Sequence, residues 1–353
     1  MKKTILTKKE QKVLYGITKY PQINDSELSD IINVKLSTLT TIKKRLYNQG
    51  YYRMLTVPLL NRLGAELLAV IYTTFNPVIP LEERVKKTKS TIEVFEEIFF
   101  SVGEQEKGFS ISLSKNYTNI GKINEIRTET FGKVGLLEND YPNEIIFPFQ
   151  ISHIHRFFDF ARVLKNLFSI QDADDKNNSQ EWFKDIGKIP FTEKEKKVYV
   201  ELVKNAQATT QQIGDKVSLS RHTISRMKQR FYNENLLKKI TVPSLNHLGF
   251  EILAFYPIKF NPSKAPKKED INALDTYSTV FLARRQFETV IISAYPTYQD
   301  YKEDKMNKIR YLKENNLILY SPLVGRYMLE KMTVIKDFNF APISNKILSN
   351  NTI

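Results

Sequence analysis

One stretch of this chain occurs twice, and the repeat constrains the fold more than any other feature. Residues 7–77 align with residues 192–262 at a constant offset of 185, without a gap. The match is densest where Thr56-Val57-Pro58, Leu60-Asn61 and Leu63-Gly64 meet Thr241-Val242-Pro243, Leu245-Asn246 and Leu248-Gly249. Solenoid repeats have periods of roughly 20–50 residues, so a gapless match of this length predicts the duplication of a whole folded unit.

The net charge of +14 is concentrated in the same part of both copies. Residues 1–62 contain twelve Lys and Arg against four Asp and Glu, and residues 188–247 contain twelve against five. The rest of the chain is therefore close to neutral. Two separate basic segments predict two surfaces for a polyanion such as double-stranded DNA.

The composition is typical of a soluble, cytoplasmic, globular protein. Its 353 residues are enough for about two to four domains. The chain has no cysteine, which excludes a disulfide framework and thiolate chemistry. The first residues lack the apolar run of a signal peptide, and no stretch reaches the roughly 18 apolar residues of a membrane span.

Each basic segment predicts three short helices. The first helix begins at a threonine with a glutamate three residues later, which is the spacing of a capping box (Thr7 with Glu10, and Thr192 with Glu195). The second helix is predicted over 25–33 and 210–217, and the third over 36–49 and 220–235. On the third helix, apolar residues at helical spacing predict one buried stripe: Leu39, Ile42 and Leu46, and Ile224, Met227 and Phe231. This order predicts a helix-turn-helix.

The outer face of the third helix carries hydroxyl and basic side chains that suit DNA. Such groups near the start of a recognition helix reach base edges, and Lys and Arg further along contact phosphates. An alternating run after the helix (51–58 and 236–243) predicts a strand and a wing. The predicted DNA-binding residues are Ser220, Arg221, His222, Ser225, Arg226, Gln229, Arg230, Lys238 and Lys239 in the second copy, and Ser37, Thr38, Thr41, Lys44, Arg45 and Arg53 in the first. For His222, a base contact and simple exposure to solvent are equally compatible with the pattern.

After the Leu-Gly step the periodicity changes to that of mixed strands and helices. In the second copy the pattern predicts strands over 252–260, 280–285, 289–294 and from 317 to 320, with helices over 267–276 and 298–315. The first copy shows the same order through 67–75, 81–89, 94–102, 108–113, 117–131 and 145–149. This β-α-β-β-α-β order is that of a ferredoxin-like sandwich. The predicted fold class is therefore α+β, a tandem duplication of a winged helix-turn-helix plus a ferredoxin-like βαββαβ sandwich.

These elements divide the chain into six segments. The predicted segments are a first winged helix-turn-helix (1–62), a first ferredoxin-like domain (63–150), a connecting helix and linker (151–187), a second winged helix-turn-helix (188–247), a second ferredoxin-like domain (248–335) and a tail (336–353). The polar run 172–180 is interpreted as the flexible linker. Residues from Phe338 onward are interpreted as a frayed end.

The order of parts resembles the feast–famine regulators of the Lrp/AsnC family. The resemblance rests on the helix-turn-helix, the run Asn235-Leu236-Leu237-Lys238-Lys239-Ile240-Thr241-Val242-Pro243, the Leu248-Gly249 step and the β-α-β-β-α-β domain that follows. It implies a sequence-specific transcriptional regulator that binds double-stranded DNA. It also implies sandwich domains that form a homodimer or sense a small-molecule effector.

This chain departs from the family in two respects. It carries two units in one polypeptide, whereas family members are single units that dimerise. Family sensor domains often have a Gly and an Asp near the turn between the middle strands, where this chain has Gly108-Phe109-Ser110 and Phe287-Glu288-Thr289. The second departure puts the effector pocket in doubt.

Two other functions remain open alongside the regulator. A replication or plasmid-maintenance initiator and an architectural DNA-binding protein would both use tandem winged helices. No cofactor is predicted, and His153 and His155 lack the neighbours of a metal site. No phosphate-binding loop or catalytic constellation stands out, so the sequence predicts a protein that is not an enzyme.

Overall fold

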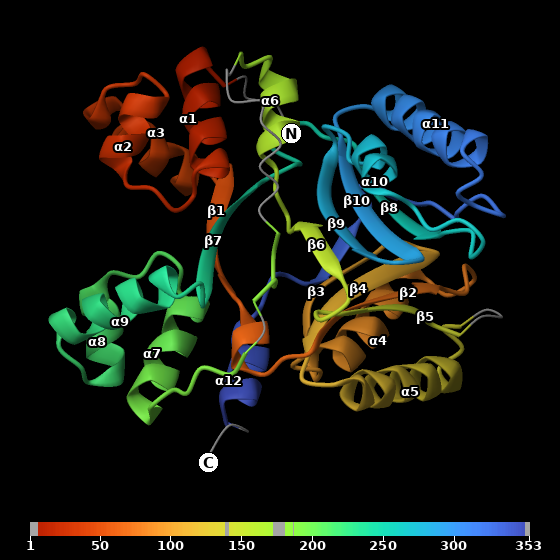
Figure 1. Ribbon diagram of the computed structural model, residues 1–353, viewed down its shortest axis with the longest axis horizontal. Helices are drawn as coiled ribbons and strands as arrows, with labels where there is room; N and C mark the ends of the chain where they lie inside the picture. The colour runs from red at the N-terminus through yellow and green to blue at the C-terminus, as the bar shows by residue number, and fades with distance from the viewer. Residues whose placement is uncertain (1–5, 138–140, 172–180, 186, 350–353) are drawn as a thin grey trace. The chain divides into compact units, whose positions relative to one another are not determined.

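The computed structural model describes residues 6–137, 141–171, 181–185 and 187–349, which divide into two compact units (Figure 1). The first unit comprises Met1–Met54, His153–Trp182 and Lys239–Glu330. The second comprises Leu55–Ser152, Phe183–Lys238 and Lys331–Ile353. Each unit therefore combines the three-helix module of one copy with the sandwich domain of the other. The sequence repeat alone did not predict this exchange.

The three-helix module of the first unit consists of α1 (Lys8–Lys19), α2 (Asp25–Ile31) and α3 (Leu36–Asn48). Thr7 Oγ1 accepts from the Glu10 amide at 3.3 Å, and the Glu10 carboxylate accepts from the Thr7 amide at 2.7 Å. The predicted capping box is therefore present. The predicted stripe on α3 is buried, and α6 (Ala161–Phe168) adds buried apolar side chains to the same cluster.

The sandwich domain of the first unit has a five-stranded antiparallel sheet in the order β11-β8-β10-β9-β6. Its strands are β6 (His153–Arg156), β8 (Ile252–Lys259), β9 (Thr279–Arg285), β10 (Glu288–Tyr295) and β11 (Gly325–Met328). The helices α10 (Lys268–Leu274) and α11 (Tyr298–Glu314) share one apolar cluster with β8, β9 and β10. Both helices therefore cover the same face of this sheet.

The last predicted strand of this domain, from 317 to 320, is wrong. The strand in that place is β11, which begins at Gly325. Leu317 and Ile318 are buried in the core at the end of α11, whereas Leu319 and Tyr320 are exposed. Leu317 and Ile318 pack into the core just after α11 ends. Because such apolar residues also favour strands, their pattern led to the wrong prediction of a strand.

The sandwich domain of the second unit has a five-stranded antiparallel sheet in the order β12-β3-β4-β2-β5. Its strands are β2 (Leu67–Thr74), β3 (Ile98–Gly103), β4 (Lys107–Ser114), β5 (Asn143–Pro148) and β12 (Thr333–Lys336). The helices α4 (Leu81–Glu93) and α5 (Tyr117–Lys133) share an apolar cluster with β2 and β3.

The three-helix module of the second unit consists of α7 (Glu193–Lys204), α8 (Thr210–Val217) and α9 (Arg221–Asn233). Thr192 and Glu195 form the predicted capping box at the start of α7. Ile224 and Phe231 are buried on α9, and Met227 of the predicted stripe is half-buried. The helix α12 (Ala341–Ser349) packs against α7.

Two strands continue from one unit into the other along the chain. They are β1 (Tyr52–Pro58) and β7 (Leu237–Pro243), and they form a two-stranded sheet. This ribbon occupies the position predicted for the wings. The short helix η1 (Leu60–Leu63) follows β1 and ends at Gly64, whose φ of 103° is a left-handed conformation that favours glycine.

The segments after the two sandwich domains form matching structures that the sequence analysis did not find. Phe158-Asp159-Phe160-Ala161 leads from β6 into α6, and Phe338-Asn339-Phe340-Ala341 leads from β12 into α12. Phe158 and Phe338 both have a positive φ, of 51° and 44°. The Asp159 amide donates to the Val280 carbonyl and the Asn339 amide to the Phe99 carbonyl, both at 2.9 Å.

The prediction of a frayed end from Phe338 is therefore wrong for the residues up to 349. Phe340 stacks on Phe99 with ring centroids 4.6 Å apart, and the apolar face of α12 is buried. The connecting segment likewise contains a strand as well as the predicted helix. The predicted linker at 172–180 lies outside the described residues.

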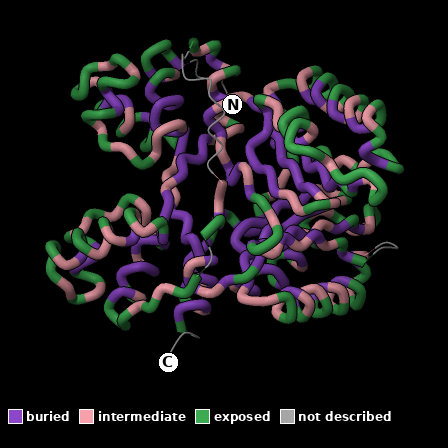
Figure 2. The backbone as a smooth tube through the Cα atoms, viewed as in Figure 1, coloured by how far each residue is buried: buried purple, intermediate pink, exposed green. Residues whose placement is uncertain are grey.

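Burial follows the expected pattern within each unit. Buried residues run along the strands and the inner faces of the helices, and the outer helix faces are exposed (Figure 2). The mixed α+β class and the antiparallel sheets are confirmed. Within the described residues, none of the helices is long and apolar enough to cross a membrane.

Candidate functional site

The residues predicted to bind DNA in the second copy are only partly presented on an outer face of α9. Arg221, His222, Ser225, Arg226 and Gln229 are exposed. Ser220 is exposed too, but it is the N-cap of α9, and its Oγ accepts from the Thr223 amide at 3.2 Å. Lys239 on β7 is half-buried.

Two of the predicted DNA-binding cations, Arg230 and Lys238, are held within the protein by ion pairs or by burial instead of being fully presented to solvent. Arg230 forms ion pairs with Glu195 and, at 2.9 Å, with Glu234. Lys238 is only 5% exposed, and burial lowers its pKa although Asp185 opposes the shift. The prediction that Lys238 touches a DNA backbone is wrong, because its place on β7 faces the interior.

The first copy repeats this arrangement. Ser37, Thr41, Lys44 and Arg45 are exposed, and Thr38 and Arg53 are half-buried. Arg45 forms an ion pair with Glu10, as Arg230 does with Glu195. In both modules the arginine of the third helix therefore binds the capping glutamate of the first helix, which holds the two helices together.

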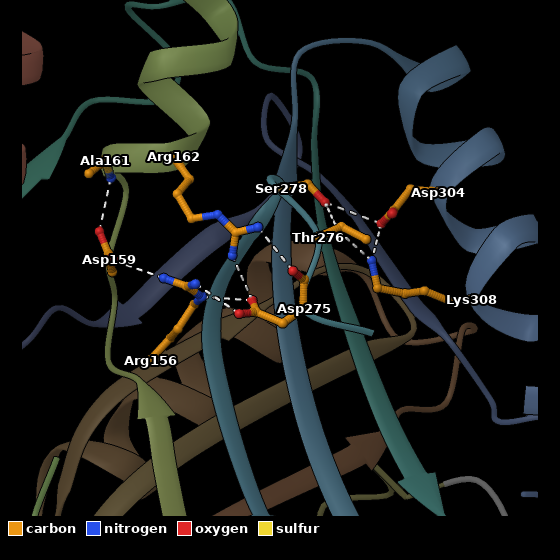
Figure 3. A network of polar contacts seen from close by, with 9 residues as sticks. All are labelled: Arg156, Asp159, Ala161, Arg162, Asp275, Thr276, Ser278, Asp304 and Lys308. Carbon is orange, nitrogen blue, oxygen red and sulfur yellow. Dashed lines mark hydrogen bonds and ion pairs between the residues drawn. The ribbon is translucent and has the colours of Figure 1, made fainter. Parts of the chain in front are cut away.

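The most concentrated buried polar chemistry lies in the sandwich domain of the first unit, beneath α11 (Figure 3). Asp304 and Lys308 stand one helical turn apart and form an ion pair whose side chains are 8% and 1% exposed. Lys308 Nζ also donates to Thr276 Oγ1 at 2.7 Å, and Ser278 Oγ donates to the Asp304 carboxylate at 3.2 Å. The carboxylate and the ammonium group are thus both held by further polar groups.

Two tyrosines extend this network into the core. The Tyr295 hydroxyl donates to Asp304, and the hydroxyls of Tyr295 and Tyr256 are 2.8 Å apart. Lys308 Nζ lies 5.6 Å from the centroid of the Tyr256 ring. Tyr256 and Tyr295 come from neighbouring strands, β8 and β10, and are at most 1% exposed.

Two arginines and two further carboxylates lie at the outer end of the same network (Figure 3). Arg156 makes hydrogen bonds to the Asp275 carboxylate at 2.7 and 2.8 Å and to Asp159 at 3.0 Å. Arg162 forms an ion pair with Asp275 at 3.0 Å, and its side chain is 27% exposed. Asp275 precedes Thr276, so the arginine cluster and the Lys308 cluster meet in adjacent residues.

Burial shifts the ionisation of these groups. It lowers the pKa of Lys308, although Asp304 raises it in part. Burial also raises the pKa of Tyr295 well above its usual range, with Tyr256 and Asp304 adding to the shift. Burial would lower the pKa of Arg156, but its bonds to Asp275 and Asp159 raise it overall. Lys308 and Tyr295 thus both donate to the same carboxylate oxygen, Oδ2 of Asp304.

The sequence analysis missed this site, although a signal was present. In the helix predicted over 298–315, Met306, Ile309 and Leu312 are the apolar residues that recur at helical spacing, but Met306 is 49% exposed. The buried face is instead formed by Tyr301, Asp304, Lys308 and Leu312. These four residues also recur at helical spacing, and the two charges among them concealed the pattern.

The two histidines considered as metal ligands make no metal site. His153 pairs with Glu181, and Arg284 Nε donates to His155 Nε2 at 3.1 Å. Burial, with the charges of Arg284 and His153, lowers the pKa of His155 to about 4. Across the described ranges, no group of three or more His, Cys, Asp or Glu is placed to hold a metal ion.

Comparisons with known proteins give matches in structure alone. No family model and no curated protein matches the chain. The crystal structure of the siroheme decarboxylase NirDL matches at 10% identity over 97% of this chain and 98% of that chain, with a TM-score of 0.50. The same enzyme in co-complex with an iron-uroporphyrin III analogue matches at 9% identity over 98% and 100%, with a TM-score of 0.53. An AsnC family transcriptional regulator from Agrobacterium tumefaciens matches at 8% identity over 40% of this chain and 90% of that chain, with a TM-score of 0.33.

These matches overturn two predictions made from the sequence. The chain was expected to be a transcriptional regulator and to lack enzymatic activity, with an initiator or an architectural protein as alternatives. The structures that match over the whole chain are those of an enzyme, whereas the regulators cover only about 40% of it. At identities of 9–10%, the matches establish that this chain is similar in fold, over nearly its whole length, to the siroheme decarboxylase NirDL.

Proposed function

We propose that this chain is an enzyme that decarboxylates a carboxylate-bearing tetrapyrrole of the siroheme type. The whole-chain similarity in fold to a siroheme decarboxylase supports a reaction of this class. The observation that carries the proposal is the buried Tyr256–Tyr295–Asp304–Lys308 network, which provides acid–base groups where the sequence had suggested none.

Decarboxylation makes two demands on the protein. The carbon–carbon bond breaks so that carbon dioxide leaves and the electron pair stays on the substrate carbon, which then takes up one proton. A positioned proton donor contributes about 10²–10⁴-fold to such a rate. The network supplies the proton: Lys308 is the buried acid, and Asp304 and Tyr295 connect it by hydrogen bonds to Tyr256.

The outer arginines meet the second demand, which is to hold a carboxylate of the substrate. Arg162 is the more exposed of the two, and its partner Asp275 is shared with Arg156. If a substrate carboxylate replaced Asp275 as the partner of Arg162, Arg156 would still be paired with Asp275. A guanidinium group binds carboxylate through two parallel N–H donors, which orients the substrate as well as attracting it.

The test measures binding and turnover with the full chain. Iron uroporphyrin III is titrated into the protein at low ionic strength and followed by its absorbance, and siroheme is incubated without oxygen and analysed by mass spectrometry for loss of carbon dioxide. We expect both binding and turnover. Absence of both would refute the proposal.

Variants on α11 then separate a catalytic network from a structural one. Lys308→Met is expected to lower the turnover rate about 100-fold or more while binding of iron uroporphyrin III changes little. Lys302→Met removes an exposed lysine from the same helix and is the matched control. Turnover by Lys308→Met at the rate of the control would show that the buried pair only stabilises the fold.

A further inference from the structure

The two sandwich domains carry a buried cation at the same position. Arg127 lies on α5 and Lys308 on α11, at the same distance along the helix from the N-cap residues Asn116 and Thr297. Arg127 is 3% exposed and Lys308 is 2% exposed. Both helices pack on the sheet of their own domain, so each cation is held between a helix and a sheet.

The surroundings of the two cations differ in one decisive way. The residue one helical turn before Lys308 is Asp304, whereas the residue one turn before Arg127 is Ile123. The strands differ as well, because Ser114 occupies the register position of Tyr295, opposite Leu67 and Ile252. The first sandwich domain in the sequence therefore keeps the buried cation and lacks the carboxylate and the phenol that accompany it in the second.

Arg127 is left with little compensation for its charge. Its Nη1 donates to Ser110 Oγ at 2.9 Å, and its guanidinium carbon lies 5.7 Å from the centroid of the Phe131 ring. Its Nε is buried without a hydrogen-bond partner, and no carboxylate in the described part of the chain lies within ion-pair distance. Burial lowers its pKa to about 10, so the group stays charged at neutral pH.

A buried charge of this kind is unfavourable unless an opposite charge accompanies it. Two hydroxyl groups of the same sheet are also buried without hydrogen-bond partners, those of Ser112 on β4 and Thr73 on β2. Hydroxyl and guanidinium groups are the donors that bind a carboxylate. The layer between α5 and the sheet thus has unused donors and excess positive charge together.

We propose that Arg127, with the neighbouring hydroxyl groups of Ser112 and Thr73, forms a binding site for one carboxylate group, and that Asp304 is a built-in substitute for this ligand beside Lys308. The two sandwich domains then have different roles. One holds an internal carboxylate permanently, and the other takes its carboxylate from a ligand. The site does not depend on the proposed tetrapyrrole chemistry, because a small free carboxylate would satisfy it equally.

The first experiment measures thermal unfolding of the full chain as formate or acetate replaces chloride at constant ionic strength. If the site takes a small free carboxylate, we expect the unfolding temperature to rise by roughly 2–4 °C, since a ligand that binds only the folded state stabilises it. Arg127→Met should abolish the rise. Lys122→Met, which removes an exposed lysine of the same helix, should retain it.

A second arm identifies the source of the carboxylate. If it belongs to a tetrapyrrole, iron uroporphyrin III will raise the unfolding temperature of the natural chain, and Arg127→Met will weaken its binding about tenfold or more, whereas formate will have no effect. If it is a small free carboxylate, formate will act and the affinity for iron uroporphyrin III will be the same in both chains. A natural chain that responds to neither ligand overturns the proposal.

The decisive variant supplies the missing carboxylate from the chain itself. Ile123→Asp places a carboxylate one turn before Arg127, as Asp304 stands before Lys308, and Ile123→Asn is the uncharged control of similar size. We expect Ile123→Asp to unfold at a higher temperature than Ile123→Asn and to lose the response to carboxylates. A lower unfolding temperature for Ile123→Asp would overturn the proposal, and this comparison holds even if Arg127→Met fails to fold.

Discussion

Removal of the ammonium group of Lys308 gives the sharpest test of the buried pair. In Lys308→Met, Asp304 loses its ion-pair partner but keeps the hydrogen bonds from Ser278 and Tyr295. Breaking a buried ion pair from one side costs about 3–5 kcal/mol, because a buried charge is left without compensation. Because Ser278 and Tyr295 still donate to Asp304, we expect the loss of stability to lie at the lower end of this range, at about 3 kcal/mol.

A double variant shows whether the ion pair itself stabilises the domain more than apolar side chains of similar size would. Asp304→Leu combined with Lys308→Met removes both charges and fills similar volume with apolar atoms. Replacing both partners in this way is often neutral or stabilising. We therefore expect the double variant to lie within about 1 kcal/mol of the natural chain, which makes it at least about 2 kcal/mol more stable than Lys308→Met alone.

The assay should report on this domain alone. A chain of two compact units need not unfold in one step, so a free energy of unfolding for the whole chain does not report on one domain by itself. Amide hydrogen exchange in α11 and β10, read by mass spectrometry, gives the local opening free energy instead. If Lys308→Met changes this free energy by less than about 1 kcal/mol, or the double variant loses more than the single one, the reasoning is refuted.

Two further predictions concern other parts of the first and second units. The pKa of His155 is lowered from 6.5 to about 4, so the unfolded chain takes up a proton first and stability falls as the pH drops from about 6.5 toward 4. With allowance for partial exposure, the loss of stability is on the order of 2 kcal/mol. Hydrogen exchange in β6 and β9, measured over a series of pH values, should show this loss in the natural chain but not in His155→Gln. Glu195→Ala removes both the capping box and the ion pair with Arg230 and should cost about 1–2 kcal/mol in the local stability of α7, while Glu195→Gln, which can still cap, should cost about half as much. Equal losses in the two Glu195 variants would show that Arg230 contributes most of the effect.

Elements governed by neighbours in the sequence were predicted well. The capping boxes Thr7–Glu10 and Thr192–Glu195 are present, and Leu39, Ile42, Leu46, Ile224 and Phe231 are buried as their helical spacing required. These features could be predicted because a helix cap and a helix face depend only on residues a few positions away in the sequence. The strand predicted at the end of the second sandwich domain failed for the opposite reason. Leu317 and Ile318 are apolar because they close the core, and this depends on α11 and the sheet together.

The buried charged residues were missed because charge was taken as a sign of exposure. Arg45, Arg230 and Lys238 were assigned to a DNA surface, but the arginines pair with Glu10 and Glu195, and Lys238 is buried. The partners of the arginines were visible in the sequence at the same offset of 185 and were not connected to them. Asp304 and Lys308 lie on a helix whose apolar spacing was considered and whose buried polar residues were not. Whether a charged side chain faces water depends on the packing of its element.

The sequence by itself determined the repeat, most of the order of helices and strands, and the α+β class, because these depend on periodicity and on capping within short windows. Tertiary structure decided which module belongs with which sandwich domain, since the exchange between the two copies involves strands and helices far apart in the chain. It also decided which charges are buried. A carboxylate and an ammonium group one turn apart are ordinary on a helix surface, and they become a buried polar network only where a sheet covers them and removes the water.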